Sequence, residues 1–131
     1  AKYITRVVTL ADGFDGGDIR AYMTAYKPLN TDLLMYYKVR ALIDPEPFSA
    51  KPWVLMTQVT NTSQYSENVD DIIEFEYRAS ANAASIQYST GTTTYDRFNQ
   101  FAIKIVARSS SPSVLPIAYD LRAIALPPSG V

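Results

Sequence analysis

The sequence predicts a single all-β domain, built as an antiparallel β-sandwich. Strand-like segments rich in Val, Ile, Thr and Tyr alternate with short runs of Gly, Pro, Asp, Asn and Ser. Several of these segments alternate apolar and polar residues with a period of two, and no segment of ten or more residues shows the helical period. Without crossover helices, we expect seven or eight antiparallel strands, arranged as a jelly roll, with a closed barrel as the competing arrangement.

The length fits one domain that covers residues 1–131. A chain of this size buries roughly two thirds of the surface that its unfolded form exposes, so it can hold a core without disulfides. Hydrophobic residues make up 47% of the chain and charged residues 19%, which excludes a disordered chain.

Four strands are expected in the first half of the chain, at residues 3–10, 19–26, 33–42 and 53–60. The glycine-rich segment 12–17 separates the first two, and the segment 44–52, with three prolines, forms a loop before the fourth. Within the third strand the apolar residues Met35, Tyr37 and Val39 share one face, so the face that carries Lys38 is expected to point outward.

The second half begins with a polar loop at residues 61–71. The clearest alternation follows, because Ile73, Phe75 and Tyr77 are interleaved with charged residues, which indicates one buried and one solvated face. Residues 79–85 are small and polar and form either a loop or one short helical turn. Residues 85–95 are expected to form a hairpin that turns near Gly91.

Two further strands complete the prediction. Residues 98–108 place Phe101, Ile103 and Ile105 inward, and a Ser/Pro loop at 109–116 leads to a last strand at 117–126. The apolar alternation of the last strand changes phase along its length, and a β-bulge near Arg122 or Ala123 would restore it.

Composition excludes several classes of function. The net charge is −1, so the basic surface that binds nucleic acid or anionic membranes is missing. The chain has no Cys and no His, which excludes thiol nucleophiles, Cys-ligated zinc and Ser-His triads. The apolar runs are too short for a membrane helix, and the N-terminal residues lack the apolar stretch of a signal peptide. We therefore expect a non-enzymatic protein without a cofactor.

Two acidic clusters deserve separate interpretations. Asp12, Asp15 and Asp18 lie among glycines, as oxygen ligands of calcium often do, but a turn in which Asp side chains cap their own backbone is the preferred interpretation. Asp70, Asp71, Glu74 and Glu76 form the densest cluster, and paired carboxylates can hydrolyse glycosides. Because Glu74 and Glu76 are expected on the outward face of a regular strand, we interpret them as part of a solvent-exposed face and not as a catalytic pair.

Four aromatic residues are candidate contacts for a ligand or a partner. Tyr36, Trp53, Tyr65 and Tyr88 could form a platform on which a sugar ring stacks. The alternative is packing in the core or across strands, which is favoured for Trp53 because it opens an apolar strand.

Sequence patterns over nearly the whole chain carry a family resemblance: YITRVVTLADGFDGGDIRAYMTAYKPLNTD at residues 3–32, then YYKV, KPWVLMTQ, FEYR, FAIKIVARSSSP and DLRAIAL. In them the chain resembles a domain of tail, baseplate and fibre-associated virion proteins of tailed bacteriophages. The resemblance implies an all-β module of the virion tail, with other tail proteins as partners, a homo- or hetero-oligomeric state and no cofactor. The strand order is also similar to jelly-roll carbohydrate-binding domains, which leaves a host-receptor or glycan-binding module of a tail fibre as the alternative.

Overall fold

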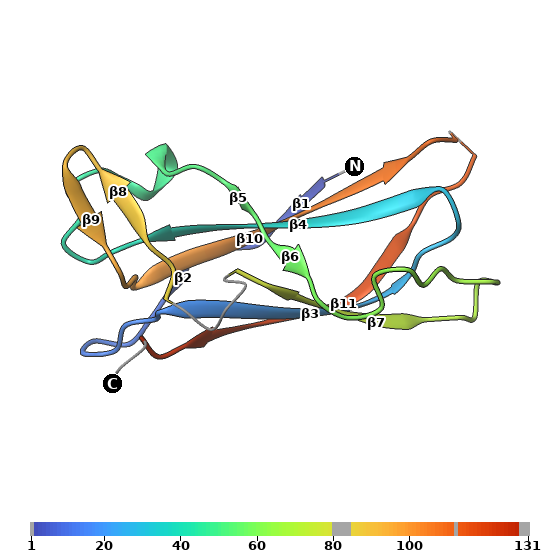
Figure 1. Ribbon diagram of the computed structural model, residues 1–131, viewed down its shortest axis with the longest axis horizontal. Coiled ribbons are helices and arrows are strands. Elements are labelled where there is room, and N and C mark those ends of the chain that lie inside the picture. Colours follow the sequence, from blue (N-terminus) through green and yellow to red (C-terminus); the bar gives the residue numbers. More distant parts are fainter. Residues whose placement is uncertain (1, 80–84, 112, 129–131) are drawn as a thin grey trace.

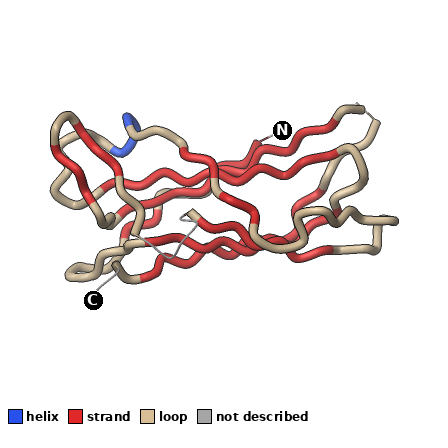
Figure 2. The backbone as a smooth tube through the Cα atoms, viewed as in Figure 1, coloured by secondary structure: helices blue, strands red, loops and turns tan. Residues whose placement is uncertain are grey.

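The structure, a computed structural model, describes residues 2–79, 85–111 and 113–128. These residues form an all-β architecture of two antiparallel sheets, as predicted (Figures 1 and 2). The first sheet contains β1 (Lys2–Ile4), β2 (Val8–Thr9), β4 (Thr31–Arg40), β5 (Val54–Leu55) and β10 (Gln100–Ser109). The second contains β3 (Asp18–Tyr26), β6 (Thr57–Gln58), β7 (Ile73–Arg78) and β11 (Ile117–Leu126).

The sheets pack face to face, as in a β-sandwich. The strand order is β1-β10-β4-β5 in the first sheet, where β2 also pairs with β10, and β11-β3-β7-β6 in the second. A separate hairpin of β8 (Tyr88–Thr90) and β9 (Thr93–Tyr95) turns at Gly91, whose φ of 60° lies in the left-handed region. The predicted hairpin is therefore confirmed, whereas the jelly-roll connectivity stays a prediction.

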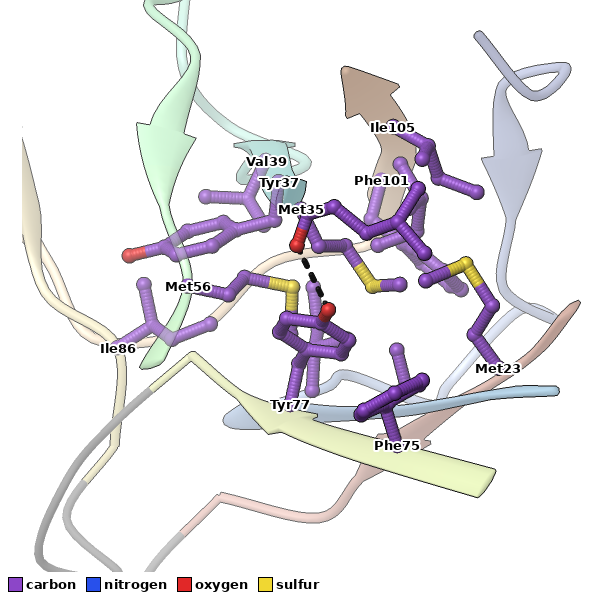
Figure 3. Packing of buried hydrophobic residues seen from close by; sticks show 14 of the residues in the cluster. Met23, Met35, Tyr37, Val39, Met56, Phe75, Tyr77, Ile86, Phe101 and Ile105 are labelled. Atoms are coloured by element: carbon purple, nitrogen blue, oxygen red, sulfur yellow. Dashed lines mark hydrogen bonds between the residues drawn. The ribbon is translucent and has the colours of Figure 1, made fainter. Parts of the chain in front are cut away.

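The core lies between the sheets and follows the predicted alternation of β4, β7 and β10, and alternate residues of β3 are buried as well. The three methionines of the chain, Met23, Met35 and Met56, are all buried there (Figure 3). Their flexible side chains fill irregular spaces between aromatic rings such as that of Phe75. The Tyr77 hydroxyl donates a 2.7 Å hydrogen bond to the Leu33 carbonyl and so links the two sheets. Burial raises the pKa of Tyr77, and the nearby Asp32 carboxylate adds to this.

The prediction of one continuous strand at residues 3–10 is wrong. β1 and β2 both pair with β10, but residues 5–7 lie opposite only residues 102 and 103, so the N-terminal segment carries one extra residue. At this break the Thr5 hydroxyl accepts a 3.0 Å hydrogen bond from the Ile103 N–H, while the Thr5 N–H donates to the Ile103 carbonyl at 2.9 Å. The side chain of Thr5 thus replaces a backbone acceptor, which interrupts the ladder.

The predicted strand at residues 53–60 is also wrong as a single element. β5 pairs with β4 in the first sheet, and β6 pairs with β7 in the second. Met56 lies between them: its N–H donates a 2.8 Å hydrogen bond to the Met35 carbonyl, and its side chain is buried. Because Met56 turns into the core, the chain crosses from one sheet to the other instead of extending either edge.

The bulge of the last strand lies earlier than predicted. The register of β11 on β3 shifts between Ala118 and Asp120, and not near Arg122 or Ala123, so Tyr119 is the extra residue. From Asp120 onward the strand is regular, with Leu121 opposite the buried Met23. Asp120 and Arg122 consequently lie on the outer face of the second sheet.

Two remaining expectations concern the loops. Residues 61–71 form no strand or helix, as predicted, whereas the loop or helical turn predicted at residues 79–85 falls mostly on residues 80–84, outside the described residues. A short 3-10 turn, η1 (Phe48–Ala50), lies between β4 and β5. In the described part of the chain, no helix has the length and hydrophobicity needed to cross a membrane.

Candidate functional site

The two sides of the sandwich differ in how the space between the sheets is covered. On one side, which we call the closed side, the segment 54–58 passes from β5 to β6 and covers the gap (Figure 1). On the other, the open side, β1 and β11 are the outermost strands of their sheets. A groove of about 480 Å³ lies there, lined by residues that include Tyr3, Leu33, Ile105, Ala107, Tyr119 and Leu121.

β11 is the longest sheet edge in the described part of the chain. It has ten residues, whereas the other edge segments β1, β2, β5 and β6 have two or three each. Among the described residues β11 pairs only with β3, which leaves the backbone groups along its other side without a strand partner. Long edges of this kind pair readily with another chain, and proteins usually shorten or cover them.

Large apolar side chains are exposed along both strands of the open side. Ile117, Tyr119 and Ile124 of β11 are 46%, 59% and 49% exposed, and Tyr3 of β1 is 61% exposed. Single exposed apolar residues are common on protein surfaces, but Tyr3 and Tyr119 line a groove that is also lined by the core residues Leu33 and Ile105. Ile124 lies on the outer face of the second sheet. The open side therefore combines unpaired backbone, apolar surface and a groove.

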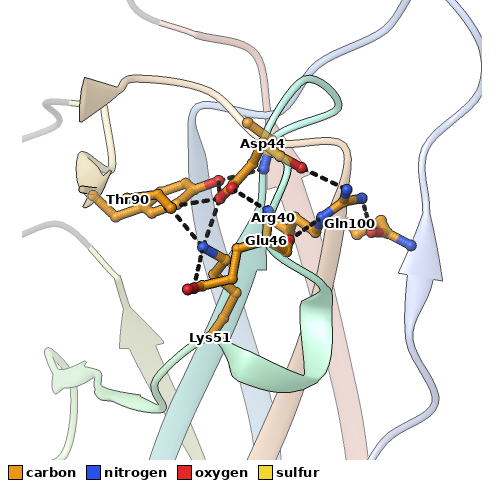
Figure 4. Close-up of polar contacts among 8 residues, drawn as sticks. Arg40, Asp44, Glu46, Lys51, Thr90 and Gln100 are labelled. Atoms are coloured by element: carbon orange, nitrogen blue, oxygen red, sulfur yellow. Dashed lines mark hydrogen bonds and ion pairs between the residues drawn. The ribbon is translucent and has the colours of Figure 1, made fainter. Parts of the chain in front are cut away.

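A buried polar cluster at one end of the molecule was not predicted from the sequence (Figure 4). Asp44 accepts hydrogen bonds from Lys51 at 2.6 Å, from the Tyr88 hydroxyl at 2.8 Å and from the Thr90 hydroxyl at 2.9 Å. Lys51 also contacts Glu46 at 2.7 Å and Thr90 at 2.7 Å, so its ammonium has three partners. The side chains of Asp44 and Lys51 are 0% and 2% exposed.

The charges of this cluster stabilise one another. Burial alone would raise the pKa of Asp44, but hydrogen bonds from Lys51, the Glu46 N–H, Tyr88 and Thr90 outweigh it and lower that pKa. Burial alone would lower the pKa of Lys51, and its two carboxylate partners raise it instead. The pairing therefore favours the charged form of both groups. The cluster ties the β8–β9 hairpin to the loop between β4 and β5.

Tyr36 and Trp53 are the two predicted aromatic residues that the structure brings together. Tyr36 lies on the outer face of the first sheet, and the Lys104 ammonium is 4.7 Å from the centre of its ring and 4.9 Å from that of Trp53. The Lys38 ammonium lies 4.8 Å from the Trp53 ring. Trp53 is half-buried and outside the core cluster, so of the two expected kinds of packing, in the core or across strands, the core is excluded. The result is a shelf of two aromatic rings and two lysines.

Tyr65 and Tyr88 lie elsewhere, so the four predicted residues do not form one platform. The Tyr65 ring contacts the ammonium of Lys27 at 4.2 Å, and the adjacent Ser66 exchanges hydrogen bonds with the Lys27 backbone. Tyr88 belongs to the buried polar cluster. Burial and the hydrogen bond to Asp44 raise the pKa of its hydroxyl to about 12, and they outweigh the hydrogen bond that this hydroxyl accepts from the Ala41 N–H, which lowers the pKa.

The glycine-rich segment 12–18 is explained by packing. A side chain on Gly16 would collide with the Phe98 ring, and one on Gly17 with the backbone of Pro128. Asp18 accepts a 2.9 Å hydrogen bond from the Ile19 N–H, as expected for an Asp that caps its own backbone. Within residues 2–79, 85–111 and 113–128, no three acidic side chains converge in a way that could hold a metal ion.

Of the second acidic cluster, Glu74 and Glu76 lie on the outer face of the second sheet, as predicted, whereas Asp70 and Asp71 belong to the loop before β7. Glu74 pairs with Arg122 at 3.1 Å and Glu76 pairs with Arg78 at 2.9 Å. An ion pair as exposed as that of Glu74 and Arg122 contributes about 1 kcal/mol or less to the free energy of unfolding.

Comparison of the chain with protein-family models, with curated proteins and with solved structures found no match. Function is therefore inferred from the residues and from the geometry of the open side and of the aromatic shelf.

Proposed function

We propose that this chain is a structural component of a phage tail or baseplate and acts through protein–protein contacts made by its open side. The observation that carries the proposal is the ten-residue edge strand β11, which lies beside an apolar groove and has one unpaired side among the described residues. An edge of this kind suits a partner chain, because an added strand satisfies its backbone groups and buries its apolar side chains.

Two further observations support this proposal. The sequence resemblance to tail, baseplate and fibre-associated virion proteins extends over nearly the whole chain, and β11 itself contains the DLRAIAL stretch of that resemblance. Two of the buried charged residues, Asp44 and Lys51, are held in a fully paired state that is suited to stability. A non-enzymatic role remains part of the proposal.

Site-specific photo-cross-linking in assembled particles tests this function. A photoreactive amino acid at Tyr119, on the open side, should cross-link to a tail protein in purified virions. The same probe at Leu29, which is 63% exposed and does not line the groove, serves as the matched control. Absence of the chain from purified particles, or equal cross-linking from both positions, would contradict the proposal.

A second function, glycan binding, is favoured by the aromatic shelf. Tyr36 and Trp53 provide rings for stacking, while Lys38 and Lys104 form no ion pair within the described residues and could bind an acidic sugar. Under this alternative the chain is a host-receptor module of a tail fibre and binds carboxylated or sulfated glycans.

Intrinsic fluorescence tests the alternative directly, because Trp53 is the single tryptophan of the chain. Titration with acidic oligosaccharides should change its emission, and the Lys104→Met variant should weaken that response. Neutral oligosaccharides of the same length are the control. Unchanged emission up to about 10 mM ligand, a concentration that would detect even a weak complex, removes the alternative.

A further inference from the structure

The partner of the open side is specified by the charge pattern of β11. Asp120 and Arg122 are the charged residues of this strand, and both lie on its outer face, separated by Leu121. Their side chains are 62% and 59% exposed; Arg122 lies 3.9 Å from Asp120 and pairs more closely, at 3.1 Å, with Glu74 of β7. Asp120 and the remaining N–H donors of Arg122 can therefore face charges of another chain.

A second copy of the chain presents the complementary pattern. When two identical strands pair about a two-fold axis perpendicular to the sheet, they run antiparallel, and outward residues stand opposite outward residues. Such a register is centred on one residue. Centring it on Leu121 puts Asp120 of each copy opposite Arg122 of the other, which makes two attractive cross-strand pairs.

The neighbouring registers are disfavoured by the same two residues. A register centred on Asp120 places two aspartates directly opposite each other, and one centred on Arg122 places two arginines opposite each other. The charges thus favour the register centred on Leu121 over its two neighbours. The bulge at Tyr119 lies outside the segment 120–122 on which this selection depends.

We propose that two copies of this chain associate through β11, antiparallel and centred on Leu121, and so join their four-stranded sheets into one continuous sheet. This inference rests on the proposed function, because it names the partner of the same open side. The pairing provides hydrogen-bond partners for the free edge of β11 and brings the apolar residues Ile117, Tyr119 and Ile124 of each copy to the junction.

Charge exchange tests the register with the full chain. Asp120→Arg and Arg122→Asp each turn both cross-strand pairs into like-charge pairs. The dissociation constant of the dimer should therefore rise at least about tenfold in each variant. An equimolar mixture of the two variants restores opposite charges across the junction, as does the double variant in one chain. Both should recover the dimer in sedimentation velocity measurements at about 100 µM protein.

Thermal unfolding of the two single variants should match the wild type within a few degrees, because the exchanged side chains are largely exposed. A wild-type chain that stays monomeric at this concentration, or a dimer that is insensitive to the single exchanges, overturns the proposal. So does a failure of the mixed variants to pair. If the chain is monomeric while Tyr119 still cross-links to a different tail protein in virions, the second-copy partner is wrong and the proposed function stands.

Discussion

The closed side and the open side of the sandwich end their sheets in different ways. On the closed side the chain crosses from β5 to β6, places Met56 in the core and follows directly on the loop that holds the Asp44–Lys51 pair. On the open side no described segment connects β1 and β11, and a groove remains between them. One side therefore supports the fold of the monomer, and the other leaves backbone and apolar surface for a partner.

The largest effect is expected from breaking the buried ion pair beside the closed side. Replacing Lys51 by Ala leaves the Asp44 carboxylate buried without its cation, which should lower the free energy of unfolding by about 3–5 kcal/mol. Denaturant titration measures this loss. The matched control is Lys2→Ala at the exposed edge β1, for which a loss comparable to that of Lys51→Ala would contradict the difference between the two sides.

A somewhat smaller loss is expected at the crossing itself. Met56→Ala removes a buried side chain from the space between the sheets and should cost about 3 kcal/mol. The neighbouring Leu55 is 55% exposed, so Leu55→Ala should change the free energy of unfolding by about 0.5 kcal/mol or less. Equal losses in the two variants would mean that the crossing segment does not close the core.

The Asp44 carboxylate also predicts a pH dependence. Its pKa is lower in the folded chain than in the unfolded chain, so the stability that it contributes is present above a pH of about 4 and is lost as the pH falls toward the folded value. The difference in unfolding free energy between the wild type and Asp44→Asn should therefore be largest near neutral pH and shrink below a pH of about 4. A constant difference from neutral pH to pH 2 would contradict the ion pair.

The smallest effect on the monomer is expected on the open side. Tyr119→Ser alters an exposed residue of the bulge and should change the free energy of unfolding by about 0.5 kcal/mol or less. Thermal unfolding of the dilute protein measures this. A loss of several kcal/mol in the free energy of unfolding would show that Tyr119 stabilises the monomer, which would contradict its assignment to a partner-binding surface.

The regular strands could be predicted from the sequence because one of their faces is buried. Met35, Tyr37 and Val39 of β4 and Phe101, Ile103 and Ile105 of β10 all lie in the core, and their alternation alone identified the inner face. The irregular edges could not be predicted in the same way. The breaks at Thr5 and Met56 and the bulge at Tyr119 depend on which strand each segment meets, and that information is tertiary.

The candidate sites were predictable only in part, for a related reason. Tyr36 and Trp53 were identified by residue type, but their separation from Tyr65 and Tyr88 follows from the sheet topology. The Asp44–Lys51 pair gave no signal in the sequence, because a carboxylate and an ammonium in a proline-rich loop look like surface residues until the β8–β9 hairpin covers them. The groove of the open side likewise arises from two strands at opposite ends of the chain.

Amide hydrogen exchange of the wild-type chain at low and high protein concentration tests the central claim most directly. The open side should respond to association: amides of β11 from Asp120 to Leu126 that exchange quickly in the dilute protein should become protected at high concentration. The amides of β5 and β6 on the closed side should be unaffected. Protection that is independent of concentration in β11, or that appears at Tyr36 and Trp53 instead, would contradict the assignment of the open side as the surface where a partner strand binds.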